Sequence, residues 1–243
     1  MVGSFTGNET TMESPHAVAV SPDGTLAFVV SDESNSLAVI DVGTDPANPA
    51  LTGSIVVGSN VEALPSNLRG LRAVALSPDG GRAYVTAYSS DKLIVFDVGT
   101  DPSNPFVLDT VGQSYENMDG PVAVALSPDG AFAFVTTQLS DDLVVFDVGT
   151  NPSYNVEQLG DVGTQLSMPA GVAVSPDGAF AYVTTRLTDT LVVFNVADRD
   201  NPVWVASVVM DWTSTTQWGW LYHRTGRWPL WRATVPTRCT FST

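Results

Sequence analysis

Basic residues, histidine and cysteine are scarce in this chain, and each shortage excludes a class of function. Residues 1–210 hold 25 acidic and 6 basic side chains, so this part would repel phosphate, which argues against a nucleic-acid partner. The single cysteine, Cys239, lies outside this part, so no disulfide holds it together. The only histidines, His16 and His223, form no His/Cys cluster of the kind that binds zinc.

Long apolar runs and familiar catalytic motifs are also missing. No run approaches the ~18 residues that a membrane-spanning helix needs, and the start of the chain lacks the charged and apolar segments of a signal peptide. No glycine-rich phosphate loop and no nucleophilic-serine elbow occurs. The sequence therefore predicts no membrane span and offers no ready-made catalytic site.

The chain does contain a repeat. Ser-Pro-Asp-Gly begins at Ser21, Ser77, Ser127 and Ser175, and a strand-like run ends 20 residues later in every copy. Proline, aspartate and glycine in this order favour a tight turn. Four short runs of strand-forming residues surround each turn, as at 17–20, 27–30, 37–40 and 51–57. Four antiparallel strands per ~50 residues predict an all-β fold, a β-propeller of four-stranded antiparallel blades with four blades present.

The spacing also predicts the domain boundaries. We expect blades 1 to 4 at 13–66, 67–116, 117–166 and 167–210, and an outer strand of a preceding blade within 1–12. The longest connection between blades, 58–70, is rich in glycine, asparagine, proline and serine. Because surface loops absorb insertions, we expect it to be exposed.

The last 33 residues differ from the rest. They contain five of the six tryptophans, four of the ten basic residues and no visible repeat. Codons read in a shifted frame across 218–226 accommodate Gly-Val-Ala-Val-Ser-Pro-Asp-Gly, followed by an aspartate at the repeat spacing. We infer a fifth blade read out of frame, so 211–243 should lack a regular blade. The alternative is a genuine Trp- and Arg-rich cap, since terminal repeats are often atypical.

The repeat motifs carry a family resemblance. Ala-Tyr-Val-Thr at 83–86, after Ser-Pro-Asp-Gly, resembles the YVTN-type propeller repeat, and 37–49 resembles the related LVIVD type. The resemblance implies a propeller that usually has seven blades and is extracellular, periplasmic or at the cell surface. Its relatives include lactonase-like and quinone- or haem-dependent enzymes. A chain with four such blades is expected to be a fragment whose exposed blade faces drive self-association.

Two groups of residues are candidates for binding. His16 and Arg72 occupy equivalent positions at the start of the first strand of their blades, where they could grip an anion; ordinary strand-end polarity is the alternative. An acidic rim of Asp32, Asp91, Asp141, Asp142 and Asp189, with Glu33 and Asn35 nearby, could bind Ca²⁺ or a cationic partner. The alternative is that these residues shape turns.

Two classes of function remain open. We favour a non-catalytic extracellular or cell-surface scaffold that binds a protein or polysaccharide, because the faces of repeat proteins commonly serve as binding surfaces. The alternative is a fragment of a lactonase-like or quinoprotein-like propeller enzyme. An enzyme would need polar groups converging on the central channel, and only His16 and Arg72 offer this. No cofactor apart from Ca²⁺ is suggested.

Overall fold

The computed structural model describes residues 12–57, 68–112, 117–149, 157–161 and 166–209. The described strands form four separate four-stranded antiparallel sheets, each built from consecutive strands. This confirms the predicted all-β fold. The predictions for 1–11, for most of the connection at 58–70 and for the tail from 210 onward lie outside the described residues. The described end of that connection corrects the expectation of exposure: Arg69 is exposed, but Gly70 is buried and Leu68 is buried because it packs into the core between blades 1 and 2.

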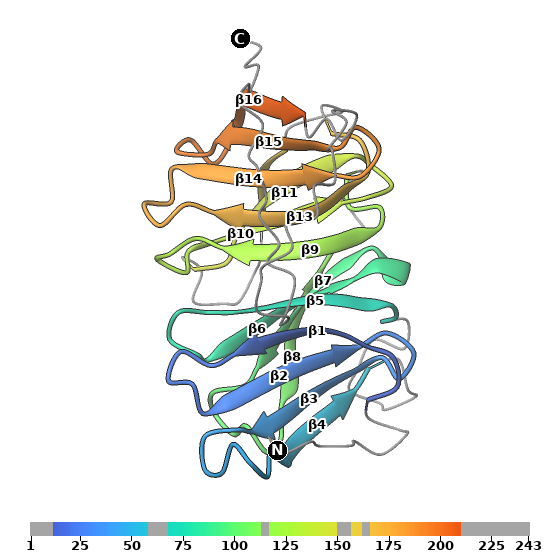
Figure 1. Ribbon diagram of the computed structural model, residues 1–243, viewed down its shortest axis with the longest axis vertical. Coiled ribbons are helices and arrows are strands. Elements are labelled where there is room, and N and C mark those ends of the chain that lie inside the picture. Colours follow the sequence, from blue (N-terminus) through green and yellow to red (C-terminus); the bar gives the residue numbers. More distant parts are fainter. Residues whose placement is uncertain (1–11, 58–67, 113–116, 150–156, 162–165, 210–243) are drawn as a thin grey trace, which may run out of the picture.

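The strands follow the repeat along the chain (Figure 1). Blade 1 comprises β1 (Pro15–Val20), β2 (Leu26–Ser31), β3 (Ser36–Asp41) and β4 (Ala50–Val56). Blade 2 comprises β5 (Leu71–Leu76), β6 (Arg82–Ala87), β7 (Lys92–Asp97) and β8 (Phe106–Val111), with the short 3-10 turn η1 (Tyr88–Ser90) after β6. Blade 3 comprises β9 (Pro121–Leu126), β10 (Phe132–Thr137), β11 (Asp142–Asp147) and β12 (Glu157–Asp161). Blade 4 comprises β13 (Pro169–Val174), β14 (Phe180–Thr185), β15 (Thr190–Asn195) and β16 (Val203–Val209).

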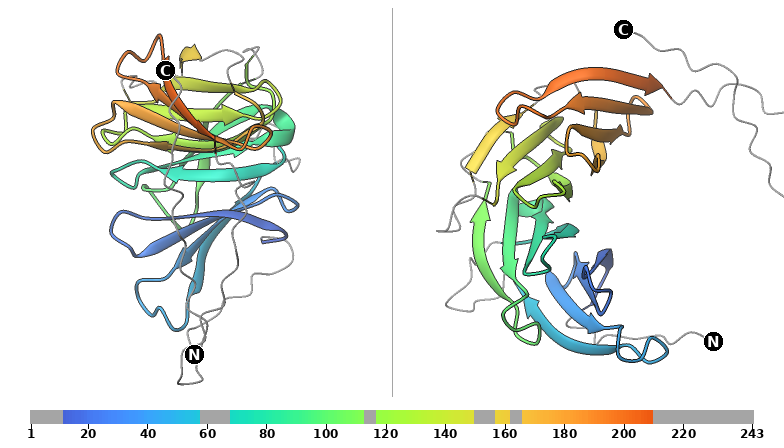
Figure 2. Two further views of the ribbon diagram at one scale, coloured as in Figure 1. Left: turned by 45° about the horizontal axis from the view of Figure 1, so that its top comes forward. Right: turned by 90° about the vertical axis from the view of Figure 1, so that its left-hand side faces the viewer.

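The four blades stand side by side in an open arc, and the first strand of each blade lies on its concave side (Figure 2, right). These inner strands, β1, β5, β9 and β13, are in contact in that order. Within the described part of the chain, no helix is long and apolar enough to cross a membrane.

Ser-Pro-Asp-Gly closes the turn between the first and second strand of every blade through the same bonds. In blade 2, the Ser77 hydroxyl donates to Asp79 at 2.5 Å and accepts from the Arg82 backbone N–H at 2.9 Å. The Asp79 carboxylate accepts from the Gly81 N–H at 2.9 Å. Gly80 takes a φ of 73°, in the left-handed region that glycine enters without steric cost. The motif is therefore a structural turn that fixes the hairpin.

Apolar cores lie between the blades. Alternate residues of a strand point to opposite faces of its sheet, so each blade contributes one set of side chains to each neighbour. Phe28 of blade 1 packs with Ile94 and Phe96 of blade 2, and corresponding clusters join blade 2 to blade 3 and blade 3 to blade 4. Burial therefore depends on the adjacent blade.

Candidate functional site

The strands of each blade run between two ends, and each end carries a different set of connecting loops. The Ser-Pro-Asp-Gly turns and the loops after β3, β7 and β15 lie at one end, which we call the turn end. The starts of the inner strands and the connections from second to third strands lie at the other, the entrance end. His16 and Arg72 are both at the entrance end, at the starts of β1 and β5.

The structure brings His16 and Arg72 together. Nη1 of Arg72 lies 2.9 Å from Nε2 of His16, and Nη2 of Arg72 lies 3.0 Å from a carboxylate oxygen of Asp32. The guanidinium carbon also lies 5.1 Å from the centre of the Tyr88 ring, within range of a cation–π interaction. We call His16, Asp32, Arg72 and Tyr88 the Arg72 cluster.

Repeat geometry explains why these four residues meet. His16 and Arg72 each stand five residues before the repeat serine, and Asp32 and Tyr88 each stand eleven residues after it. The first two positions begin an inner strand, and the last two follow the neighbouring strand of the same sheet. Because blades 1 and 2 are adjacent, these two positions of blade 1 and the same two positions of blade 2 lie close together at the entrance end.

Arg72 is held by its neighbours and is accessible from outside. Its side chain is 33% exposed and that of Asp32 is 26% exposed, so the pair is accessible from outside. The Nε atom of Arg72 is buried and has no hydrogen-bond partner among the residues that the structure describes. This buried atom is out of reach of a ligand. Each terminal nitrogen of the guanidinium carries two N–H groups, so the accessible end of Arg72 can donate to a further acceptor besides His16 and Asp32. An arginine fork offers bidentate hydrogen bonds to carboxylates and other oxyanions.

The protonation of His16 follows from its partner. The guanidinium has only donors and no acceptor, so Arg72 must donate to His16 and Nε2 of His16 must accept. Nε2 therefore carries a lone pair and no proton in this arrangement. That is the form of imidazole that can accept a proton in catalysis.

Four residues of the predicted acidic rim region share one backbone conformation. Asn35, Asp91, Asp141 and Asp189 all have a φ between 47° and 58°, a left-handed conformation that asparagine and aspartate tolerate in turns. Three of them bond across a blade junction: Asn35 accepts from the Gly70 N–H at 2.8 Å, Asp91 from Gly120 at 2.9 Å and Asp141 from Met168 at 2.7 Å. We call these contacts the junction bonds.

The other predicted rim residues separate from one another. Asp32 pairs with Arg72, and Asp142 is only 2% exposed, in β11. Burial raises the pKa of Asp119, and the nearby Asp91 carboxylate adds to this rise. Across the described residues, no group of three or more His, Cys, Asp or Glu side chains is arranged to hold a metal ion. Calcium binding at the rim stays a prediction.

Sequence reasoning identified His16 and Arg72 but missed Tyr88 and assigned Asp32 to the rim. The sequence nevertheless contains a signal that marks the positions of Asp32 and Tyr88. Both the position five residues before the repeat serine and the position eleven after it differ among the four copies, with Val122, Ala170, Gln138 and Arg186 standing there in blades 3 and 4. Variation at two positions on the same edge of the sheet marks a place that the repeat does not need for its fold.

Comparisons with known proteins agree with this architecture. The sequence matches the family described as "Lactonase, 7-bladed beta-propeller" over residues 10–153 and 74–211. A search of the curated proteins found no match. A solved structure of a protein from Lactobacillus plantarum is 25% identical, with a TM-score of 0.67, over 80% of this chain and 57% of that one.

Two further solved structures carry lactonase titles. The periplasmic gluconolactonase of Pseudomonas aeruginosa is 24% identical, with a TM-score of 0.63, over 79% of this chain and 53% of that one. A putative 6-phosphogluconolactonase from Bacteroides fragilis is 21% identical, with a TM-score of 0.63, over 84% of this chain and 57% of that one. The chain thus spans somewhat over half the length of these structures. The family match covers most of the chain, which therefore belongs to the lactonase family of seven-bladed β-propellers.

Proposed function

We propose that this chain is part of a lactonase-like propeller enzyme that hydrolyses a sugar lactone at the Arg72 cluster. The family match supports this alternative better than the non-catalytic scaffold that the sequence favoured. The observation that supports it most is the accessible Arg72 guanidinium at the entrance end, which contacts both Nε2 of His16 and the Asp32 carboxylate. The finer assignment of the repeats to the YVTN and LVIVD types rests on their motifs alone.

The residues of the cluster would divide the reaction between them. The lactone carbonyl oxygen would displace Nε2 of His16 as the acceptor of Arg72, and the guanidinium would stabilise the negative charge that develops on that oxygen. His16, released with an unprotonated Nε2, would take a proton from the attacking water. The tetrahedral intermediate would then break its bond to the ring oxygen, which would receive the proton back from His16. Asp32 and Tyr88 would keep the guanidinium in place through charge and its aromatic face.

The family resemblance and the relatives' titles supply further expectations. A location outside the cytoplasm stays a prediction, and the printed description of the Pseudomonas aeruginosa relative as periplasmic is in keeping with it. Binding of a protein or polysaccharide, and self-association through blade faces, also stay predictions. None of these is needed for the lactonase proposal.

The test is hydrolysis of gluconolactone followed in a pH-stat, because the ring opening releases an acid. The wild-type chain should exceed the spontaneous rate. Arg72→Ala should lower the enzymatic rate about 10²-fold or more, as the loss of an oxyanion-binding donor does, and His16→Ala should lower it to a similar degree. Arg186→Ala removes the arginine eleven residues after the repeat serine in blade 4 and should leave the rate unchanged. A wild-type rate equal to the spontaneous rate would overturn the proposal.

A further inference from the structure

The junctions between neighbouring blades at the turn end are built from the same repeat positions. The junction of blades 1 and 2 forms a cleft, which is bounded on one side by the Ser-Pro-Asp-Gly turn and the start of the second strand of blade 1. On the other side lie the corresponding turn and the loop after the third strand of the next blade. Residues at equal distances from the repeat serine can therefore be compared from junction to junction, and their differences are informative.

A guanidinium lies at the junction of blades 3 and 4. Arg199 of blade 4 lies over the rings of Phe132 and Phe134 of blade 3, at 4.8 and 5.5 Å from their centres. It donates to the carbonyl oxygens of Gly178, at 2.9 Å, and of Val196. Burial lowers the pKa of Arg199, and the Asp129 carboxylate of blade 3 opposes this. Aromatic rings, two carbonyls and a carboxylate thus surround the cation.

A guanidinium also lies at the junction of blades 2 and 3, but it belongs to the earlier of the two blades. Arg82 stands five residues after its repeat serine and donates from Nη1 to the carbonyl oxygen of Val148, at 3.2 Å. Val148 and Val196 are equivalent residues, each 21 positions after the repeat serine. Two different blades therefore send an arginine to the same carbonyl position, which indicates that this position favours a cation.

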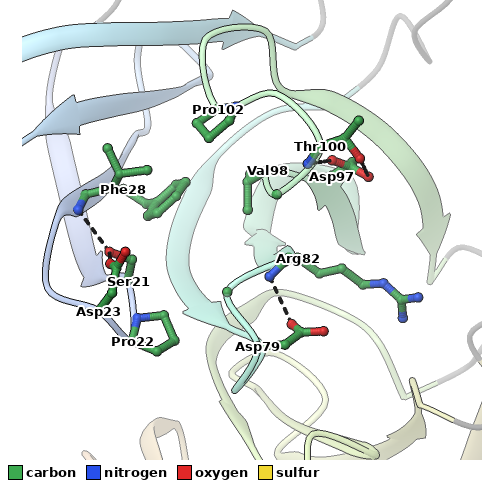
Figure 3. Close-up of a pocket in the computed structure, with 14 residues that line it drawn as sticks. Ser21, Pro22, Asp23, Phe28, Asp79, Arg82, Asp97, Val98, Thr100 and Pro102 are labelled. Carbon is green, nitrogen blue, oxygen red and sulfur yellow. Dashed lines mark hydrogen bonds between the residues drawn. The ribbon is translucent and has the colours of Figure 1, made fainter.

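The cleft between blades 1 and 2 has no such arginine. Leu26 stands where Arg82 stands in blade 2, and the facing loop, 98–105, contains no basic residue. A hollow of about 570 Å³ lies here, and Phe28 is among the residues that line it (Figure 3). Arg82 also lines it, but its side chain runs away from Phe28 (Figure 3) toward blade 3.

This hollow repeats most of the groups that hold Arg199. Gly80 and Val98 both line the hollow. They are equivalent to Gly178 and Val196, whose carbonyl oxygens accept from Arg199 at the junction of blades 3 and 4. Asp23 is the equivalent of Asp129 and lines it too, together with Asp79 and Asp97. Leu26 replaces the ring of Phe132, so the apolar surface is smaller. The charge of the lining is nevertheless suited to a cation.

We propose that the cleft between blades 1 and 2 binds a guanidinium group, supplied by an arginine side chain of another molecule. Such a group would donate to the Gly80 and Val98 carbonyls and face the Asp23 carboxylate, as Arg199 does at the equivalent positions. Fork-shaped donors fit two carbonyls better than the single ammonium of lysine does. The site is at the opposite end of the blades from the Arg72 cluster and does not depend on the lactonase proposal.

The test is titration of the ¹⁵N-labelled full chain with N-acetyl-arginine methylamide, followed by amide chemical shifts. Saturable shifts should centre on Thr25, Gly80, Gly81 and Val98. The matching lysine amide should bind about tenfold more weakly or not at all, since one charge-assisted contact is worth about that factor. A short peptide with one central arginine should bind more tightly than the amide. Equal binding of peptide and amide would indicate a free guanidinium compound and would contradict an arginine side chain as the source.

Exchanges between equivalent positions provide the controls. Leu26→Arg should place a guanidinium in the cleft between blades 1 and 2, as Arg82 does at the junction of blades 2 and 3. This variant should show none of these shifts. Phe180→Arg makes the same kind of change in blade 4, outside the cleft between blades 1 and 2, and should leave binding intact. Arg82→Leu gives blade 2 the residue that blade 1 has at the equivalent position, Leu26. It should create a second set of shifts near Val148, at the junction of blades 2 and 3. Absence of saturable shifts in the wild-type chain, equal binding of arginine and lysine amides, or full binding by Leu26→Arg would each overturn the proposal.

Discussion

Blades 1 and 2 differ from blades 3 and 4 at the entrance end although all four share one fold. The starts of β1 and β5 carry His16 and Arg72, whereas the starts of β9 and β13 carry Val122 and Ala170. The strand pairing of the blades is nevertheless the same. Residues that the copies share thus build the blades, and the positions where they differ carry the groups that can bind a ligand.

Blades 2 and 4 make the complementary comparison, because they share residues but not surroundings. Tyr84 and Tyr182 are equivalent, yet Tyr84 is 1% exposed and Tyr182 is 37% exposed. Tyr84 faces the core shared with blade 3. Tyr182 faces away from blade 3, where the described residues provide no further blade. The identity of a residue alone therefore does not determine its contribution to stability.

Truncating these two tyrosines should produce the largest effect. Tyr84→Ala should lower the free energy of unfolding by about 3 kcal/mol or more, because it leaves a large cavity in a buried core. Tyr182→Ala should cost less than half of this, since its side chain is already partly in contact with water. Urea unfolding monitored by circular dichroism measures both. Equal losses would show that the two blades are equally enclosed.

The junction bonds should give the next largest effect. Asp91→Ala removes the acceptor for the Gly120 N–H at the junction of blades 2 and 3 and should cost about 1–3 kcal/mol. Asp189→Ala removes the equivalent residue of blade 4, which shares the left-handed backbone. The strain of alanine in that conformation is common to both variants, so the difference in unfolding free energy isolates the junction bond. If both variants lose the same amount, the bond across the junction contributes nothing.

A smaller, pH-dependent effect is expected at the Ser-Pro-Asp-Gly turns. The Ser77 hydroxyl and then the Gly81 N–H hold the pKa of Asp79 below its ordinary value of 3.8. A folded-state pKa below the unfolded one stabilises the protein above pH 3.8, and this contribution is lost as the pH falls through the lower, folded-state pKa.

Ser77→Ala should therefore destabilise the chain more at neutral pH than in strong acid. Part of its effect should not depend on pH, because the Ser77 hydroxyl also accepts from the Arg82 N–H. Unfolding midpoints measured from pH 7 down to strong acid test this. A difference between variant and wild type that stays constant, or grows, as the pH falls would contradict the assignment.

The sequence predicted the strands closely because a repeat supplies four independent readings of one pattern. The runs expected at 17–20, 27–30 and 37–40 fall within β1, β2 and β3, whereas the expected 51–57 is displaced by one residue from β4 (Ala50–Val56). Equal spacing averages out local ambiguity. Strands such as β3 and β7 are buried at five consecutive positions, because each of their two faces is covered.

The candidate site was predicted only in part, because it depends on contacts between blades. His16 and Arg72 were recognisable as polar residues at an apolar position of the repeat. The pairing of Asp32 with Arg72 crosses a blade junction, and no local pattern reveals it. The same limit applied to Asn35, Asp91 and Asp141, whose turn conformation is local but whose junction bonds reach the next blade.

One paired measurement separates residues that hold the fold from residues that bind a ligand. Gluconate, the carboxylate that a gluconolactonase would release, is titrated calorimetrically into wild type, Arg72→Met and Asp91→Ala, and each is also unfolded in urea. Arg72→Met should lose gluconate binding and change the unfolding free energy by no more than about 1 kcal/mol, as is usual for exposed ion pairs. Asp91→Ala should be destabilised yet bind normally below its unfolding transition. Normal binding by Arg72→Met, or loss of binding confined to Asp91→Ala, would contradict the account.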